Sequence, residues 1–116
     1  MKPGLLRVRV AAELLGVTSQ TVRNRLRSGE LAGVELGDRS WRVIASAIVG
    51  EDRQVVPPGP NRVDSAWVAE AWSVSRNMVR TLARDGVLPG LWRGGVWTFR
   101  RQDLIEFADE HTTGAA

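Results

Sequence analysis

An internal repeat constrains the fold of this chain more than any other feature. A shift of 57 positions places a segment of the first half on a segment of the second, with the same residue at many positions. The coinciding pairs are Ala12 and Ala69, Glu13 and Glu70, Val17 and Val74, Val22 and Val79, Arg23 and Arg80, Arg27 and Arg84, Gly29 and Gly86, Leu31 and Leu88, Gly33 and Gly90, and Gly37 and Gly94. Such a shared register indicates a duplicated domain. Two small units are therefore expected, each with a compact core.

In the first copy, a tight turn leads into a short basic helix. Thr18 is placed to cap it, because its side-chain oxygen can accept a hydrogen bond from a free amide of the first turn. Gly29 stands where helices commonly end in a left-handed residue. Val22 and Leu26, four residues apart, form an apolar edge. The polar side chains that lie largely elsewhere on the helix are Ser19, Gln20, Arg23, Asn24 and Arg27.

Another helix is predicted in each copy, directly before the turn that leads into the basic helix. Apolar residues from Val8 to Leu15 recur at helical spacing, and Gly16 interrupts them. Arg7 stands at the N-cap position of this helix and is a poor cap. Asp64 is a good cap for the equivalent helix in the second copy.

Two short alternating runs follow in each copy and indicate a β-hairpin. The runs are residues 34–36 and 41–43 in the first copy, and residues 91–93 and 96–99 in the second. Gly94 and Gly95 are a strong two-residue turn signal. They place Trp92 opposite Trp97, where aromatic contact can stabilise a small hairpin. The short closing helices expected after the hairpins cover residues 44–49 and 102–107.

These elements predict two domains joined by a linker. Residues 1–50 and 63–111 are the expected domains, residues 51–62 a linker rich in proline and glycine, and residues 112–116 a frayed tail. Proline and glycine disfavour a helix in the linker, and Pro57-Pro58 favours an extended, semi-rigid segment. The predicted fold class is mainly α with small β-hairpin wings, that is α+β.

The order helix, turn, helix, hairpin wing and short helix resembles the winged helix-turn-helix of the excisionase and MerR-type DNA-binding families. The residues that carry the resemblance are 11–18, 21–22 and 27–31 in the first copy, and 68–70, 74–75, 78–80, 84–89 and 97–104 in the second. The resemblance implies two tandem winged helix-turn-helix domains, and the first copy is the more specific match. Arg25 departs from the pattern, since this position is usually apolar and the second copy has Leu82. The long dimerisation helix and effector domain of MerR regulators are absent, so a ligand- or metal-sensing activator is not expected.

The charge of the chain suits a polyanionic partner. Its formal net charge is +3, carried by fifteen arginines and one lysine against 13 acidic residues. Arginine makes bidentate contacts to phosphate and guanine more readily than lysine does, although so small a net charge is shared by many other classes of protein. Because the chain has no cysteine, disulfides and thiolate metal sites are excluded. Without a membrane span or signal peptide, we expect a cytoplasmic protein, nucleoid-associated when bound to DNA.

The two basic helices are the candidate DNA-binding elements. Arg, Asn and Gln side chains suit base edges in the major groove, and we expect Arg23 and Arg80 to contact bases. The candidates beside them are Ser19, Gln20, Asn24, Arg76, Asn77 and Thr81. Arg27 and Arg84, one turn further on, could equally hold phosphates. The alternative is an exposed face in a fold that no longer binds DNA; the duplication favours groove binding.

Other residues carry weaker expectations. In the wings, Arg39, Arg42 and Arg93 could contact phosphate or the minor groove, or could belong to solvated hairpins. The tryptophans expected in the core are Trp41, Trp72 and Trp97, whereas Trp92 is left open. His111 falls at the end expected to fray and is assigned neither a ligand nor a catalytic role. No nucleophile, metal cluster or phosphate-binding loop is visible, so we expect no enzyme, no cofactor, no small-molecule ligand and no membrane partner.

The sequence therefore predicts sequence-specific binding of double-stranded DNA by two recognition helices in adjacent major grooves. By resemblance, the protein would act as an excisionase (recombination directionality factor) of a phage or mobile element, or as a small transcriptional regulator. An integrase or another protein is a candidate partner. The alternative is a protein-interaction module in which one or both winged helices bind a partner protein. Retention on heparin and salt-sensitive binding of random DNA would favour the first hypothesis.

Overall fold

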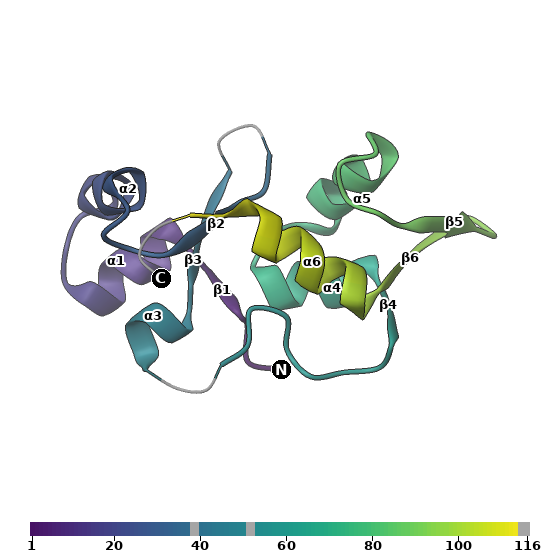
Figure 1. The fold of residues 1–116 in the computed structure, drawn as a ribbon, viewed down its shortest axis with the longest axis horizontal. Helices are drawn as coiled ribbons and strands as arrows, with labels where there is room; N and C mark the ends of the chain where they lie inside the picture. Colours follow the sequence, from purple (N-terminus) through teal and green to yellow (C-terminus); the bar gives the residue numbers. More distant parts are fainter. Residues whose placement is uncertain (38–39, 51–52, 114–116) are drawn as a thin grey trace.

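Both halves of the chain have the same order of elements: strand, helix, helix, two-stranded hairpin and closing helix (Figure 1). The computed structural model describes residues 1–37, 40–50 and 53–113. The first half contains β1 (Leu5–Arg7), α1 (Val8–Leu15), α2 (Ser19–Ser28), β2 (Gly33–Glu35), β3 (Trp41–Ile44) and α3 (Ser46–Val49). The second contains β4 (Arg62–Asp64), α4 (Ser65–Trp72), α5 (Arg76–Arg84), β5 (Leu91–Arg93), β6 (Val96–Arg100) and α6 (Arg101–His111), and β7 (Thr112–Thr113) follows. The architecture is mixed, with helices and small antiparallel sheets.

Local signals explain where the helices begin and end. Thr18 caps α2 as predicted, because its side-chain oxygen accepts a hydrogen bond from the amide of Thr21 at 3.1 Å. Gly29 ends this helix in the left-handed conformation, with φ of 85°. Asp64 caps α4 by accepting a hydrogen bond from the amide of Trp67 at 2.9 Å. In the described parts of the chain, no helix is long and apolar enough to cross a membrane.

The two predicted hairpins are present, each within a small antiparallel sheet. β2 pairs with β3, and β5 pairs with β6. Trp92 lies directly opposite Trp97, and their ring centroids are 5.4 Å apart. Each hairpin also pairs with a strand that the sequence did not predict: β1 pairs with β3, and β4 with β6.

The C-terminal part of the chain is more ordered than predicted. Thr112 and Thr113 form β7, which pairs with Val34 and Gly33 of β2 and completes the sheet order β1-β3-β2-β7. His111 ends α6, and its Nδ1 lies 2.8 Å from the carbonyl oxygen of Phe107. The expected fraying is therefore wrong for residues 111–113. Residues 114–116 lie outside the described part.

The segment between the halves is packed against the second half. Residues 53–61 contain no helix, as predicted, and no strand, but the side chain of Val56 is buried in the core. The indole nitrogen of Trp72 donates to the carbonyl oxygen of Val55 at 3.2 Å. The guanidinium of Arg101 donates to the carbonyl oxygens of Pro57 at 2.6 Å and Val56 at 3.1 Å. The segment is therefore held against the second half by these contacts.

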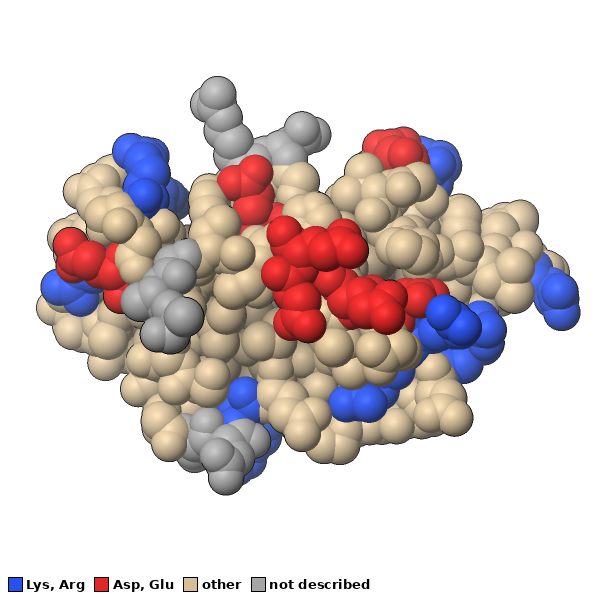
Figure 2. Space-filling view, in the orientation of Figure 1, with Lys and Arg blue, Asp and Glu red and all other residues tan. Residues whose placement is uncertain are grey.

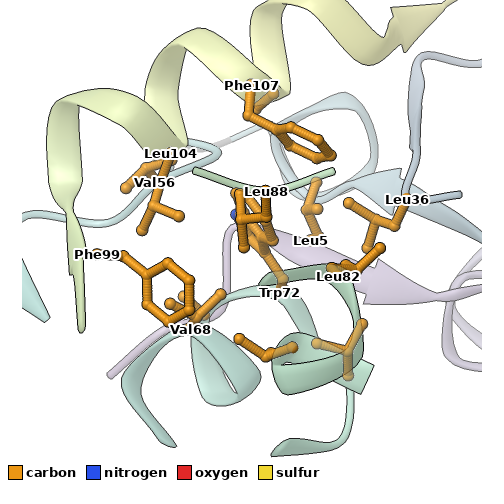
Figure 3. Packing of buried hydrophobic residues seen from close by; sticks show 14 of the residues in the cluster. Leu5, Leu36, Val56, Val68, Trp72, Leu82, Leu88, Phe99, Leu104 and Phe107 are labelled. Atoms are coloured by element: carbon orange, nitrogen blue, oxygen red, sulfur yellow. The ribbon is translucent and has the colours of Figure 1, made fainter. Parts of the chain in front are cut away.

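The two halves share one hydrophobic core. Leu5, Val34 and Leu36 of the first half are fully buried in a cluster that consists mostly of second-half residues. Figure 3 shows the central members of this cluster: Leu5, Leu36, Val56, Val68, Trp72, Leu82, Leu88, Phe99, Leu104 and Phe107. A smaller cluster belongs to the first half alone and contains Ala11, Ala12, Val22, Leu26, Leu31 and Val43. Small units gain stability by pooling apolar surface, and here that pooling docks the halves onto each other.

The tryptophans differ in burial. Trp72 lies in the shared core and is 1% exposed, as predicted. Trp41 and Trp97 are half-buried, and each packs against the core of its own half. Trp92 is 57% exposed, and it lies on β5, the edge strand in the sheet order β4-β6-β5.

Candidate nucleic-acid interface

Helix α2 presents a polar face to solvent. Val22 and Leu26 are buried in the first-half core, which turns the rest of the helix outward. The exposed polar residues are Gln20, Arg23, Asn24 and Arg27, whereas Ser19 and Arg25 are half-buried. The side-chain amide of Gln20 donates to the side-chain oxygen of Asn24 at 3.0 Å. This bond orients two side chains of a type that can read adenine edges.

Helix α5 has the same design in the second half. Val79, Leu82 and Ala83 are buried, and Ser75 caps the helix by accepting a hydrogen bond from the amide of Met78 at 3.0 Å. The predicted residues that are exposed on this helix are Arg76, Asn77, Arg80 and Arg84, and Thr81 is half-buried. Arg84 lies 3.8 Å from the carboxylate of Asp85, an exposed ion pair of little energetic weight.

Each of these helices borders a groove that its hairpin also lines. In the first half the groove has a volume of about 950 Å³, and Arg23, Arg27 and Trp41 line it. In the second half it has a volume of about 400 Å³, and Arg80 and Trp97 line it. Arg23 and Arg80 are repeat partners, so the repeat in the sequence corresponds to equivalent positions in space.

The predicted wing residues have different environments. Arg93 is exposed at the end of β5, and Arg39 lies outside the described residues. Arg42 is half-buried, and its Nε donates to the carbonyl oxygen of Ser73 at 2.9 Å while its Nη1 donates to that of Trp41 at 2.9 Å. Burial lowers the pKa of Arg42, and the neighbouring charge of Arg7 lowers it further. The structure thus gives Arg42 a bond between the halves that the sequence did not predict.

Ser73 is an unusual residue at the turn between α4 and α5. It has φ of 55°, in the left-handed region where its repeat partner Gly16 has φ of 68°. A residue with a side chain is strained there, and contacts with the first half offset the strain. The Ser73 hydroxyl donates to the carbonyl oxygen of Leu5 at 2.7 Å, and the Ser73 carbonyl accepts from both Arg7 and Arg42.

Sequence reasoning missed two arginines of the first-half groove. Arg7 and Arg9 are exposed and line it together with Arg23 and Arg27. Their spacing on either side of Val8 was visible in the sequence. The position of Arg7 and Arg9 in the groove could not be seen in the sequence, because it depends on the pairing of β1 with β3.

The surface over α6 carries the opposite charge. Figure 2 shows acidic side chains gathered over this helix, with basic ones beside its start and others distributed around the edges of the molecule, including near α2 and α5. The acidic residues of α6 are Asp103, Glu106, Asp109 and Glu110. A polyanion approaching this face would be repelled.

Comparison with known proteins relates part of the chain to a protein family. Residues 66–112 match the family model of a helix-turn-helix domain. This segment includes almost all of α4 and the whole of α5, the second hairpin and α6, so the match lies in the second copy and not in the first, where we expected the more specific one. No curated protein and no solved structure gives a significant match. The second half of the chain is thus similar to the helix-turn-helix domain family, and this similarity indicates DNA binding by a helix-turn-helix.

Proposed function

We propose that the chain binds double-stranded DNA sequence-specifically, with α2 and α5 in two adjacent major grooves. The observation that carries the proposal is the matched placement of Arg23 and Arg80. Both are exposed on a capped basic helix, and both line a groove between that helix and its hairpin. Arginine reads guanine through two hydrogen bonds in the major groove. In this proposal both halves are winged helix-turn-helix units.

The dimensions of the molecule support the use of two grooves. Its longest extent is 44 Å, and successive major grooves on one face of DNA are ~34 Å apart. In Figure 1, α2 and α5 are separated along the longest axis and lie toward the same edge of the molecule. One molecule is therefore long enough to span one helical turn.

The proposed biological role is that of an excisionase of a phage or mobile element, or of a small transcriptional regulator. Both roles need sequence-specific DNA binding and no catalysis, so the proposal includes no enzymatic activity. An integrase or another DNA-bound protein would be the partner in the first role. The candidate DNA-contacting residues remain those proposed from the sequence, with Arg23 and Arg80 at their centre.

A second candidate function rests on the wing of the second half. Leu91, Trp92 and Val96 are 40%, 57% and 51% exposed on the β5–β6 hairpin. Apolar side chains gathered on an exposed hairpin are typical of a surface that binds a protein. Under this alternative, the chain would be a protein-interaction module.

Selection from a random pool of duplex DNA, followed by a salt titration on the selected site, tests the proposal. We expect a defined sequence to be enriched. The logarithm of the binding constant should fall linearly with the logarithm of salt concentration, by about 0.9 for each phosphate contacted. Retention of the protein on heparin, a polyanion, would also support DNA binding. Failure to enrich any sequence, with binding that does not depend on salt, would favour the protein-interaction module.

A further inference from the structure

The groove beside α2 is built from both halves of the chain. Its arginines come from the end of β1, the start of α1, α2 and β3, and Met78 of α5 closes it together with the N-cap residue Ser75. We call it the arginine groove and define it by Arg7, Arg9, Arg23, Arg27 and Arg42. Its volume of about 950 Å³ is open to solvent rather than filled by other side chains.

Positive charge accumulates in this groove without a compensating acid. No carboxylate lines it among the described residues, and the ion pairs formed within that part of the chain involve other residues. Arg7 and Arg42 even donate to the same oxygen, the carbonyl of Ser73, at 3.3 and 2.9 Å. Like charges held this close repel each other, so a bound anion would relieve an unfavourable interaction.

The arrangement is held in place by contacts between the halves. The amide of Gly4 donates to the carbonyl oxygen of Ala71 at 2.9 Å, and the Ser73 hydroxyl donates to that of Leu5 at 2.7 Å. These bonds fix β1, and with it Arg7 and Arg9, against the turn that precedes α5. The wall of the groove that Ser75 and Met78 form is therefore present only when the two halves are docked.

We propose that Arg7 and Arg9, on the side of the arginine groove away from the base-reading Arg23, bind one stretch of the sugar–phosphate backbone of DNA, between the two major grooves that α2 and α5 enter. This inference rests on the proposed function and adds Arg7 and Arg9 to the residues that contact DNA. The planar guanidinium group binds phosphate oxygens through two parallel hydrogen bonds. The positive end of the α5 helix dipole, at the edge of the same groove, favours the same ligand.

Arg9→Ala and the double variant Arg7→Ala/Arg9→Ala test this proposal in the full chain. Arg9 forms no hydrogen bond with the described residues, so the single variant should fold like the parent. We expect binding to weaken to a similar extent on all sequences. The salt slope should fall by about 0.9 for Arg9→Ala and by about twice that for the double variant. Arg62→Ala, which removes an exposed arginine outside the groove, is the matched control and should leave the slope unchanged.

Ethylation interference on the selected site locates the contact. With the parent protein, ethylated phosphates between the two major-groove segments should block binding, and the double variant should lose this block. The inference is overturned if the double variant keeps the salt slope and the interference pattern, even though Arg23→Ala and Arg80→Ala abolish sequence preference. In that case the proposed function still holds. A parent protein that binds no DNA overturns both.

An experiment with inorganic phosphate distinguishes binding of the DNA backbone from binding of a small anion. If millimolar phosphate raises the thermal midpoint of the parent but not of Arg9→Ala, while DNA binding of the two is identical, the groove binds a small anion. That result would contradict the assignment to the DNA backbone.

Discussion

Insertion of five base pairs between the two half-sites of the selected DNA should abolish the contribution of one recognition helix. Five base pairs are about half a helical turn, so the second major groove would face away from the protein. A chain with a flexible linker could follow that displacement, because an extended segment of about 13 residues reaches roughly 40 Å. The docked halves of this structure cannot follow it unless they separate.

The buried residues set the cost of separation. Leu5, Val34 and Leu36 are each fully buried in the core that the halves share. Exposing a side chain of this size costs about 1.5–3 kcal/mol, so the three together cost roughly 5–9 kcal/mol. The second recognition helix adds about 10²–10⁴ in affinity, which corresponds to about 3–5.5 kcal/mol. The free energy needed to separate the halves exceeds the binding free energy that the second recognition helix would contribute, so the halves should stay docked.

Fluorescence anisotropy with duplexes that carry insertions of five or ten base pairs measures this effect. We expect both insertions to lower the affinity by about 10²–10⁴, to that of one helix acting alone. With the ten-base-pair insertion the second major groove again faces the protein, but it lies ~34 Å further along the DNA. The docked halves cannot span this added distance. The same insertions outside the site are the control. Parental affinity with either insertion would refute the reasoning.

Three further predictions concern single residues. Arg23→Ala and Arg80→Ala should each weaken specific binding by about 1–3 kcal/mol, whereas Arg62→Ala should have little effect; parental affinity of both folded helix variants would show that the helices do not read bases. Ser75→Ala removes the cap of α5 and should lower the free energy of unfolding by about 1 kcal/mol in urea titrations; an unchanged midpoint would count against the cap. The hydrogen bond from Arg100 lowers the pKa of Asp103, so the contribution of this carboxylate to stability is present at neutral pH and is lost as the pH falls from the ordinary aspartate range toward the lowered pKa. Asp103→Asn should therefore make the thermal midpoint less sensitive to acid, and an equal acid sensitivity of parent and variant would contradict this.

Local signals made the helices and hairpins predictable. Thr18 and Gly29 bound α2 because capping depends on a few neighbouring residues. Gly94 and Gly95 both have positive φ and turn the second hairpin. The exposed face of each basic helix followed from helical periodicity in the same way.

The docking of the halves could not be predicted, because it depends on single contacts between distant residues. Nothing around Gly4 or Leu5 in the sequence indicates that they bond to Ala71 and Ser73. The left-handed conformation of Ser73 is equally hidden, because serine rarely adopts it. The role of Arg42 between the halves depends on that conformation.

Guanine methylation interference on the selected site tests the central claim most directly, with the parent, Arg23→Ala and Arg80→Ala compared side by side. The parent should show two clusters of major-groove interference about one helical turn apart. Arg23→Ala should erase one cluster, and Arg80→Ala should erase the other. A single cluster with the parent, or two clusters that neither substitution changes, would contradict the claim that α2 and α5 each read a major groove.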